Sequence, residues 1–159
     1  MKHIENPLPL TVIRQRKKIS RNKLAELTGV KLGAIQPWEQ RTVDIMNATT
    51  HYIIKIAQAL ECTVEDLIEE VPDIDYELLK KYTTKTATDS AKKCIGTTRL
   101  EAYRRAAGLS RLQLSQITSV PIGTIQHFEQ EINIIGNTEL HTVCRLAKAF
   151  GVSVEDIVD

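Results

Sequence analysis

The sequence predicts an all-α protein with two five-helix units in tandem, joined by a partly helical linker. Three observations support this fold class: the second part of the chain repeats the first, apolar residues recur at helical spacing, and turn signals separate the segments. Aromatic residues make up only 4% of the chain, and glycine and proline are few. This composition favours small helical cores of Leu, Ile, Val and Ala.

The repeat is visible when residues 10–68 are aligned with residues 100–158 without a gap. The two segments are identical at 20 of 59 positions, far above chance. A period of 90 residues is long enough for each copy to be a small domain. A copy of about 60 residues is near the lower limit for an independent core, so we expect the copies to pack on each other or on the linker.

The repeat and the composition of the linker divide the chain into three parts. We expect domain 1 over residues 1–70, a linker with a short helix over residues 71–98, and domain 2 over residues 99–159. Within the linker, residues 73–82 have the apolar spacing of a helix. Residues 83–93 are small and polar and are expected to be the most flexible segment.

The first copy has the start and stop signals of five short helices. Ser20 is the expected N-cap of the second helix, Gly29 suits its C-terminal turn, and Thr63 is the expected N-cap of the fifth. The fourth helix is expected to begin at a cap formed by Thr49 or Thr50. The helices are expected near residues 10–17, 20–28, 31–39, 49–60 and 63–67.

The second copy repeats these signals with two changes. Ser110 and Gln113 have the spacing of a capping box, whereas the first copy has Lys23 in place of the glutamine. Ser119 replaces Gly29, and a left-handed conformation at that position costs a non-glycine residue on the order of 1 kcal/mol.

Both copies contain a short helix, a tight turn and a second helix, followed by further helices. The residues are ISRNKLAELTGVKLGAIQPWEQ from Ile19 and IIKIAQALECTVEDL from Ile53, and copy two has LSRLQLSQITSVPIGTIQHFEQ and VCRLAKAFGVSVEDI. This pattern resembles the Cro/CI (XRE) phage-repressor family of lambda-repressor-like helix-turn-helix domains. The resemblance implies DNA binding, with the third helix of each copy in the major groove.

The resemblance also implies which residues contact DNA. They are Arg21, Lys23, Lys31, Leu32, Gly33, Gln36 and Arg41 in copy one, and Arg111, Ile122, Gly123, Thr124, Gln126 and His127 in copy two. Base reading needs paired donors and acceptors, which Gln36 and Gln126 supply and Leu32 does not. Pro37 removes a helix hydrogen bond and is expected to kink or shorten the third helix.

The same family places an arginine of the first helix against the glutamate that ends the third. Arg14 and Glu39 stand at these positions in copy one, and Arg104 and Glu129 in copy two. A charge-assisted bond in each pair would join the two helices as a structural ion pair. The alternative is that these are unrelated surface charges.

The distribution of charge distinguishes the two copies. The net charge of the chain is +1, so only a local basic patch is available for DNA. Residues 1–70 carry 10 basic and 9 acidic side chains, whereas residues 99–159 carry 6 and 7. Glu131 also replaces Arg41 in copy two. We therefore expect domain 1 to be the stronger DNA binder.

Other notable side chains favour structural roles. Trp38 and Phe128 occupy matched positions and are expected to pack in cores. His51 and His141 have no second ligand at i+3 or i+4, so no metal and no cofactor are expected. No Gly-rich phosphate loop or nucleophile-and-base pair indicates an enzyme. The three cysteines have no C-x-x-C partner and no signal peptide or membrane span is evident, which indicates reduced thiols in a cytoplasmic protein.

Two functions are compatible with these observations. The first is a DNA-binding transcriptional regulator that carries two helix-turn-helix units on one chain and has double-stranded DNA as its partner. The alternative is an antitoxin-like or inhibitor-like protein-binding module with weak or no sequence-specific DNA binding, which the near-zero net charge, Leu32, Ile122 and Pro37 favour. A homodimer is compatible with either function, and no membrane partner is expected.

Overall fold

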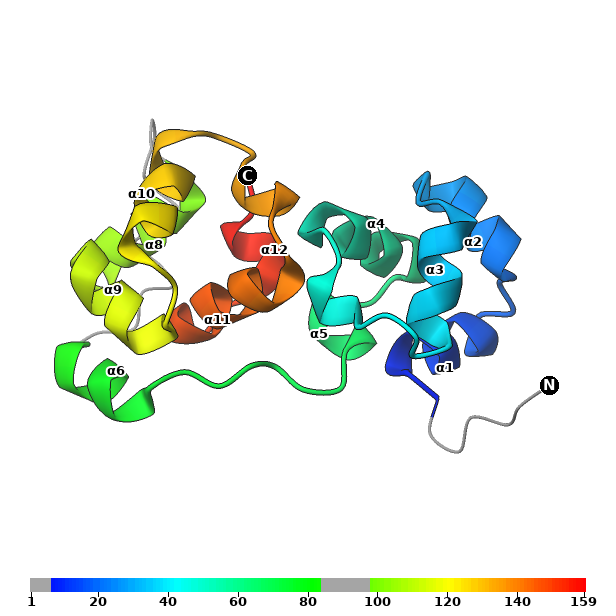
Figure 1. The fold of residues 1–159 in the computed structure, drawn as a ribbon, viewed down its shortest axis with the longest axis horizontal. Helices are drawn as coiled ribbons and strands as arrows, with labels where there is room; N and C mark the ends of the chain where they lie inside the picture. Colours follow the sequence, from blue (N-terminus) through cyan, green and yellow to red (C-terminus); the bar gives the residue numbers. More distant parts are fainter. Residues whose placement is uncertain (1–6, 84–97) are drawn as a thin grey trace.

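A computed structural model describes residues 7–83 and 98–159, and the fold of this part of the chain is all-α (Figure 1). The first copy, called repeat 1 from here on, contains α1 (Pro9–Arg16), α2 (Arg21–Thr28), α3 (Leu32–Glu39), the 3-10 helix η1 (Ile45–Asn47), α4 (Thr50–Leu60) and α5 (Val64–Leu67). The linker contains α6 (Tyr76–Tyr82). Repeat 2 contains α8 (Arg99–Ala106), α9 (Arg111–Thr118), α10 (Ile122–Gln130), the 3-10 helix η2 (Ile135–Asn137), α11 (Leu140–Phe150) and α12 (Val154–Ile157).

Local capping explains where most of the short helices begin and end. The Ser20 hydroxyl accepts a hydrogen bond from the Lys23 amide at the start of α2, and a complete capping box of Ser110 and Gln113 starts α9. The turns after these helices use the left-handed conformation, with φ of 68° at Gly29 and 57° at Ser119. The expected cap of α5 at Thr63 is likewise confirmed.

Thr49 is the N-cap residue of α4, one of the two expected positions, but it makes no side-chain capping hydrogen bond. The Thr50 hydroxyl instead donates to the carbonyl oxygen of Thr138, 2.7 Å away in the other repeat. The start of α4 lies at the contact between the repeats. The Thr50 hydroxyl therefore bonds the other repeat and does not cap the helix. Pro37 lies inside α3, which is one residue shorter than α10.

Each repeat has its own core of equivalent aliphatic side chains. Leu10, Leu24, Ile35, Ile53 and Leu67 are fully buried in repeat 1, and Leu100, Leu114, Ile125, Val143 and Ile157 are fully buried at the matching places in repeat 2. Trp38 and Phe128 are also buried and belong to these cores. The helical spacing of these residues puts them on the inner faces of the helices, where their burial drives folding.

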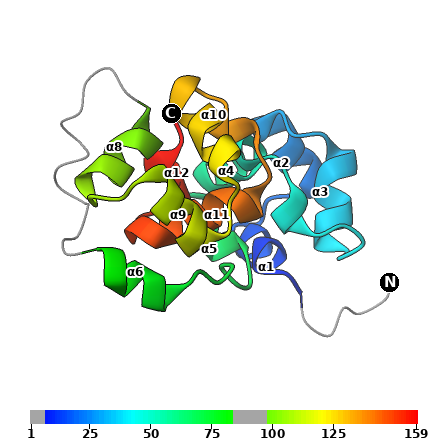
Figure 2. The ribbon, with the colours of Figure 1, turned by 60° about the vertical axis from the view of Figure 1, so that its left-hand side comes forward.

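The linker helix α6 packs against α9 of repeat 2 (Figures 1 and 2). The Asp75 amide donates to the Ile117 carbonyl oxygen at 2.8 Å, and Ile117 is fully buried. The equivalent residue of repeat 1, Leu27, has no such cover and is 54% exposed. Lys148 of α11 also donates to the linker, at the carboxylate of Asp73. Residues 84–93 of the segment expected to be flexible lie outside the described residues.

The two repeats contact each other through their fourth and fifth helices. Helix α4 packs against η2 and α11, α11 packs against η1, and α5 packs against α12. The first helices and the third helices lie outside this contact, so α3 and α10 stand on opposite sides of it (Figure 1). In the described part of the chain, no helix is long and apolar enough to cross a membrane.

Candidate nucleic-acid interface

A buried ion pair holds the helix-turn-helix unit of repeat 1 together. Glu39 ends α3, and its side chain is fully buried. Its carboxylate accepts hydrogen bonds from Nε and Nη2 of Arg14, at 2.6 and 2.9 Å. Arg14 Nη1 donates in addition to the Ile19 carbonyl oxygen before α2, at 2.6 Å. One arginine therefore joins α1, the segment before α2 and the end of α3.

A second arginine donates to the same carboxylate. Nε of Arg21, the first residue of α2, donates to Glu39 Oε2. This residue was expected to contact DNA, and its side chain is 39% exposed. The ion pair fixes the position of the guanidinium at the surface beside α3, so Arg21 has a structural role whether or not it also contacts a phosphate.

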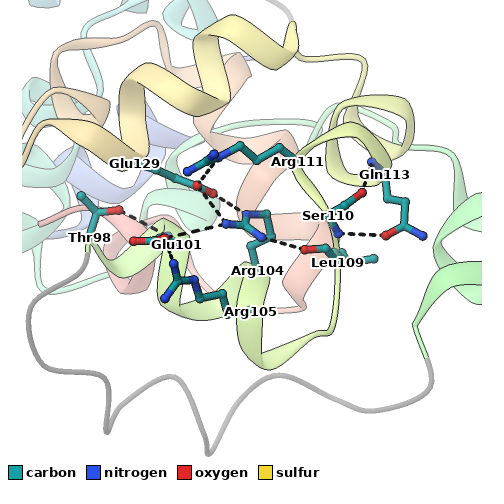
Figure 3. Close-up of polar contacts among 9 residues, drawn as sticks. All are labelled: Thr98, Glu101, Arg104, Arg105, Leu109, Ser110, Arg111, Gln113 and Glu129. Atoms are coloured by element: carbon teal, nitrogen blue, oxygen red, sulfur yellow. Dashed lines mark hydrogen bonds and ion pairs between the residues drawn. The ribbon is translucent and has the colours of Figure 1, made fainter.

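Repeat 2 builds the same arrangement from the equivalent residues (Figure 3). Arg104 donates to both carboxylate oxygens of Glu129, at 2.5 and 3.0 Å, and to the Leu109 carbonyl oxygen at 2.8 Å. Arg111 Nε donates to Glu129 at 2.6 Å. The ion pairs that the resemblance implied for each copy are thus present in both, and α10 is held against α8 and α9 as α3 is held against α1 and α2.

Figure 3 also shows a carboxylate that repeat 1 lacks. Glu101 lies 2.5 Å from Arg105 and 3.9 Å from Arg104, and Thr11 occupies its place in repeat 1. The additional negative charge neutralises one of the few basic side chains of repeat 2. The electrostatic attraction of repeat 2 for phosphate is therefore weaker than that of repeat 1.

The first turn of α3 presents its predicted base-reading residues to solvent. Lys31, Leu32, Gly33 and Gln36 are all exposed. A shallow pocket separates this turn from the start of α2, and it is lined by Arg14, Ser20, Arg21, Asn22, Leu32 and Gln36. The amide ends of α2 and α3, basic side chains and two carboxamides therefore meet on a single surface, as a contact with a DNA backbone and base edges requires.

Asn22 of this pocket is a polar residue that the sequence reasoning missed. It follows Arg21 at the start of α2 and is exposed beside Leu32 and Gln36. The alignment of the repeats pairs it with Leu112, an apolar residue that is 57% exposed. The fold does not require a particular side chain at this position, because one repeat has an amide there and the other a leucine. The polar residue in repeat 1 could therefore have been recognised as a candidate for DNA contact.

The equivalent surface of repeat 2 is less polar. Ile122 is 46% exposed, Gly123, Gln126 and His127 are exposed, and Thr124 is half-buried. Pro121 stands where repeat 1 has Lys31. The surface keeps Gln126 and His127 as hydrogen-bonding groups at the predicted base-reading positions.

Besides Arg21, two further predicted DNA contacts in repeat 1 are ion-paired within the protein. Arg41 follows the C-terminal end of α3, and its guanidinium binds both carboxylate oxygens of Glu69, at 2.9 and 2.5 Å. The hydrogen bond from Arg41 lowers the pKa of Glu69. Lys23 lies 3.1 Å from Glu26 one turn along α2, and both side chains are exposed. A phosphate would have to compete with these carboxylates, and both contacts stay predictions.

The two short helices, the left-handed turn between them and the ion-paired second helix define a helix-turn-helix unit. Residues 9–73, which comprise repeat 1 and the start of the linker, match the family model of the Cro/C1-type HTH DNA-binding domain. Neither the curated proteins nor the solved structures contain a match to the chain. This match supports double-stranded DNA as the class of partner for repeat 1.

Proposed function

We propose that this chain is a transcriptional regulator whose two repeats are both helix-turn-helix domains that bind DNA, with repeat 1 the stronger binder. The observation that carries the proposal is the duplicated ion-paired unit, in which Glu39 and Glu129 each hold two arginines of their own repeat. The first turns of α3 and α10 are exposed in both repeats. The protein would act in the cytoplasm, where DNA is accessible, and without a catalytic role.

Three substitutions between the repeats support the difference in strength. Repeat 1 has Lys31 and Asn22 where repeat 2 has Pro121 and Leu112. Phosphate contacts by lysine release counterions, and amides donate hydrogen bonds to phosphate oxygens, whereas proline and leucine side chains do neither. The additional carboxylate of Glu101 acts in the same direction.

A pair of matched variants tests this proposal. Gln36 and Gln126 occupy the same position of the two recognition helices and are both exposed. We expect Gln36→Ala to weaken binding of the full chain to a duplex selected from a random library by about tenfold, and Gln126→Ala to weaken it less. Binding is measured by fluorescence anisotropy between 50 and 200 mM salt, over which affinity should fall steeply. Binding that does not depend on salt would reject the proposal, and a larger effect at Gln126 would reject the ranking of the repeats.

One observation favours protein binding as a second function for repeat 2. Leu112 and Ile122 are 57% and 46% exposed, and their counterparts in repeat 1 line one pocket. Apolar side chains at this position suit a protein partner better than a phosphate backbone. If repeat 2 binds a protein, Leu112→Asn should release a stoichiometric protein from the full chain in pull-down experiments and leave DNA affinity unchanged or stronger.

A further inference from the structure

The contact between the repeats has the symmetry of a dimer interface. The Thr50 amide donates to the Thr138 carbonyl oxygen at 3.0 Å, and the Leu140 amide donates to the Ala48 carbonyl oxygen at 2.9 Å. Residues 50 and 140 are equivalent in the repeat, as are residues 48 and 138. Between them, Thr49 forms an antiparallel bridge with Glu139, its own counterpart. An element that pairs antiparallel with its own equivalent is related to it by a two-fold rotation.

A second reciprocal pair lies at the fifth helices. The Val64 amide at the start of α5 donates to Glu155 Oε1 at 3.0 Å, and the Val154 amide at the start of α12 donates to Glu65 Oε1 at 3.0 Å. In each repeat, a glutamate side chain therefore accepts a hydrogen bond from the amide at the start of the last helix of the other repeat. Two independent pairs with this property exclude a translational, head-to-tail arrangement of the repeats, which a tandem duplication would otherwise suggest.

The two-fold relation determines how α3 and α10 are presented to a ligand. A two-fold rotation keeps the direction along its axis and reverses the directions across it. The first turns of α3 and α10 therefore have equal components of direction along the axis, and the components of the two helix directions across the axis are opposite. On a duplex, two units related in this way read half-sites of opposite polarity.

The residues at the two reading surfaces are not the same. Repeat 1 presents Lys31, Leu32 and Gln36, whereas repeat 2 presents Ile122, Gln126 and His127. Gln36 and Gln126 are equivalent, but Lys31 is replaced by Pro121 and His127 stands where repeat 1 has Pro37. Lysine and histidine offer different hydrogen-bonding groups to base edges, and proline side chains offer none. The two half-sites therefore differ in sequence.

From this symmetry, and resting on the proposed function, we propose that one copy of the chain binds one duplex that carries two unlike half-sites as an imperfect inverted repeat with a single fixed spacing. The surface that would recruit a second copy through the fourth and fifth helices is occupied by the other repeat. The complex therefore contains one chain for each site, where two copies of a single-repeat protein would be needed.

The experiment begins with selection by the full chain from a randomised duplex library, followed by native mass spectrometry of the complex. The expected motif is an imperfect inverted repeat bound by one chain. Reversing one half-site should leave only single-unit binding and lower affinity by about a hundredfold. Inserting five base pairs, about half a helical turn, between the half-sites should have the same effect.

A direct repeat, a single half-site, or a palindrome bound by two chains would overturn the inference but keep the protein as a DNA binder. If no duplex is enriched, the proposed function and the inference fail together.

A variant of the contact tests whether the symmetry sets the spacing. Glu65→Lys combined with Glu155→Lys removes both reciprocal acceptors and leaves the reading surfaces unchanged. We expect this chain, checked for helical content by circular dichroism, to tolerate the five-base-pair insertion with less than about tenfold loss of affinity. The matched control is Glu77→Lys on the exposed face of α6, which should keep the strict spacing. A double variant that keeps the strict spacing would show that the contact does not set it, and would overturn the inference.

Discussion

At the scale of single residues, the carboxylate of Glu39 accepts hydrogen bonds from Arg14 and Arg21 although its side chain is fully buried. Removing the charge of Glu39 leaves the buried Arg14 guanidinium without its counter-ion. Breaking a buried pair in this way costs about 3 to 5 kcal/mol. We expect Glu39→Gln to lower the free energy of unfolding of repeat 1 by about 3 kcal/mol, measured by urea denaturation with Trp38 fluorescence as the probe of this repeat.

Glu26→Gln is the matched control, because Glu26 pairs with Lys23 at the surface, where both side chains are largely exposed. Exposed pairs contribute little to stability, so the urea midpoint of this variant should stay within experimental error. If Glu39→Gln proves as mild as the control, the ion pair does not hold the helix-turn-helix unit together.

Burial also predicts a difference in reactivity between two cysteines. Desolvation, with the nearby Glu65 and Glu155 carboxylates, raises the pKa of Cys144 to about 12, so about one thiol in ten thousand is ionised at pH 8. Burial raises the pKa of Cys62 too, but this thiol is only half-buried. Alkylation of the native chain at pH 8, followed by peptide mass spectrometry, should therefore modify Cys62 well before Cys144. Equal rates for the two peptides in the folded protein, but not in urea, would contradict this prediction.

At the scale of helices, the C-terminal turns of α2 and α9 differ in the residue that adopts the left-handed conformation. Ser119 has φ of 57° and Gly29 has φ of 68°. Glycine adopts this conformation without the strain of a Cβ atom, and an added Cβ at Gly29 would meet nothing within 4 Å. We expect Ser119→Gly to raise the free energy of unfolding of the chain by about 1 kcal/mol. Gly29→Ser should lower it by a similar amount, and both changes are measured by thermal denaturation. Shifts of the same sign in the two variants would contradict the argument.

The start and end of the helices could be predicted because they depend on neighbouring residues. Ser20, Thr63 and Ser110 cap helices through residues three positions away, and the repeat supplied the same evidence twice. Thr50 was misinterpreted for the opposite reason. Its hydroxyl bonds a carbonyl oxygen 88 residues away, and no local pattern distinguishes that role from capping.

The predicted site shows the same division between local and distant causes. The pairing of Arg14 with Glu39 was implied by the family resemblance, which carries information about contacts between helices. The engagement of Arg41 by Glu69 across 28 residues was not, because an exposed arginine near a recognition helix has the same local sequence whether it meets a phosphate or a carboxylate.

At the scale of the whole molecule, the contact between the repeats is symmetric in its reciprocal hydrogen bonds but not in all of its side chains. The His51 ring of α4 lies over Gly136 of η2, where a Cβ atom would come within 2.3 Å of it. The equivalent of Gly136 in repeat 1 is Met46, and the equivalent histidine, His141, lies instead 3.4 Å from Glu139 of its own repeat. The two histidines therefore make different contacts on the two sides, and the sequence of either repeat alone does not reveal this difference.

This specialisation predicts a strong coupling between His51 and Gly136. Gly136→Ala should destabilise the contact because the His51 ring has to leave its position, and His51→Ala should remove that obstacle. In a double-mutant cycle, the free energy of unfolding of the double variant should exceed the value expected from the two single variants by about 1 to 3 kcal/mol. The matched cycle with His141→Ala and Met46→Ala should show a smaller coupling, because the His141 ring lies against Glu139 of its own repeat. Additive effects of His51 and Gly136 would mean that the ring moves aside at no cost, and the close approach would then not hold the two repeats in register.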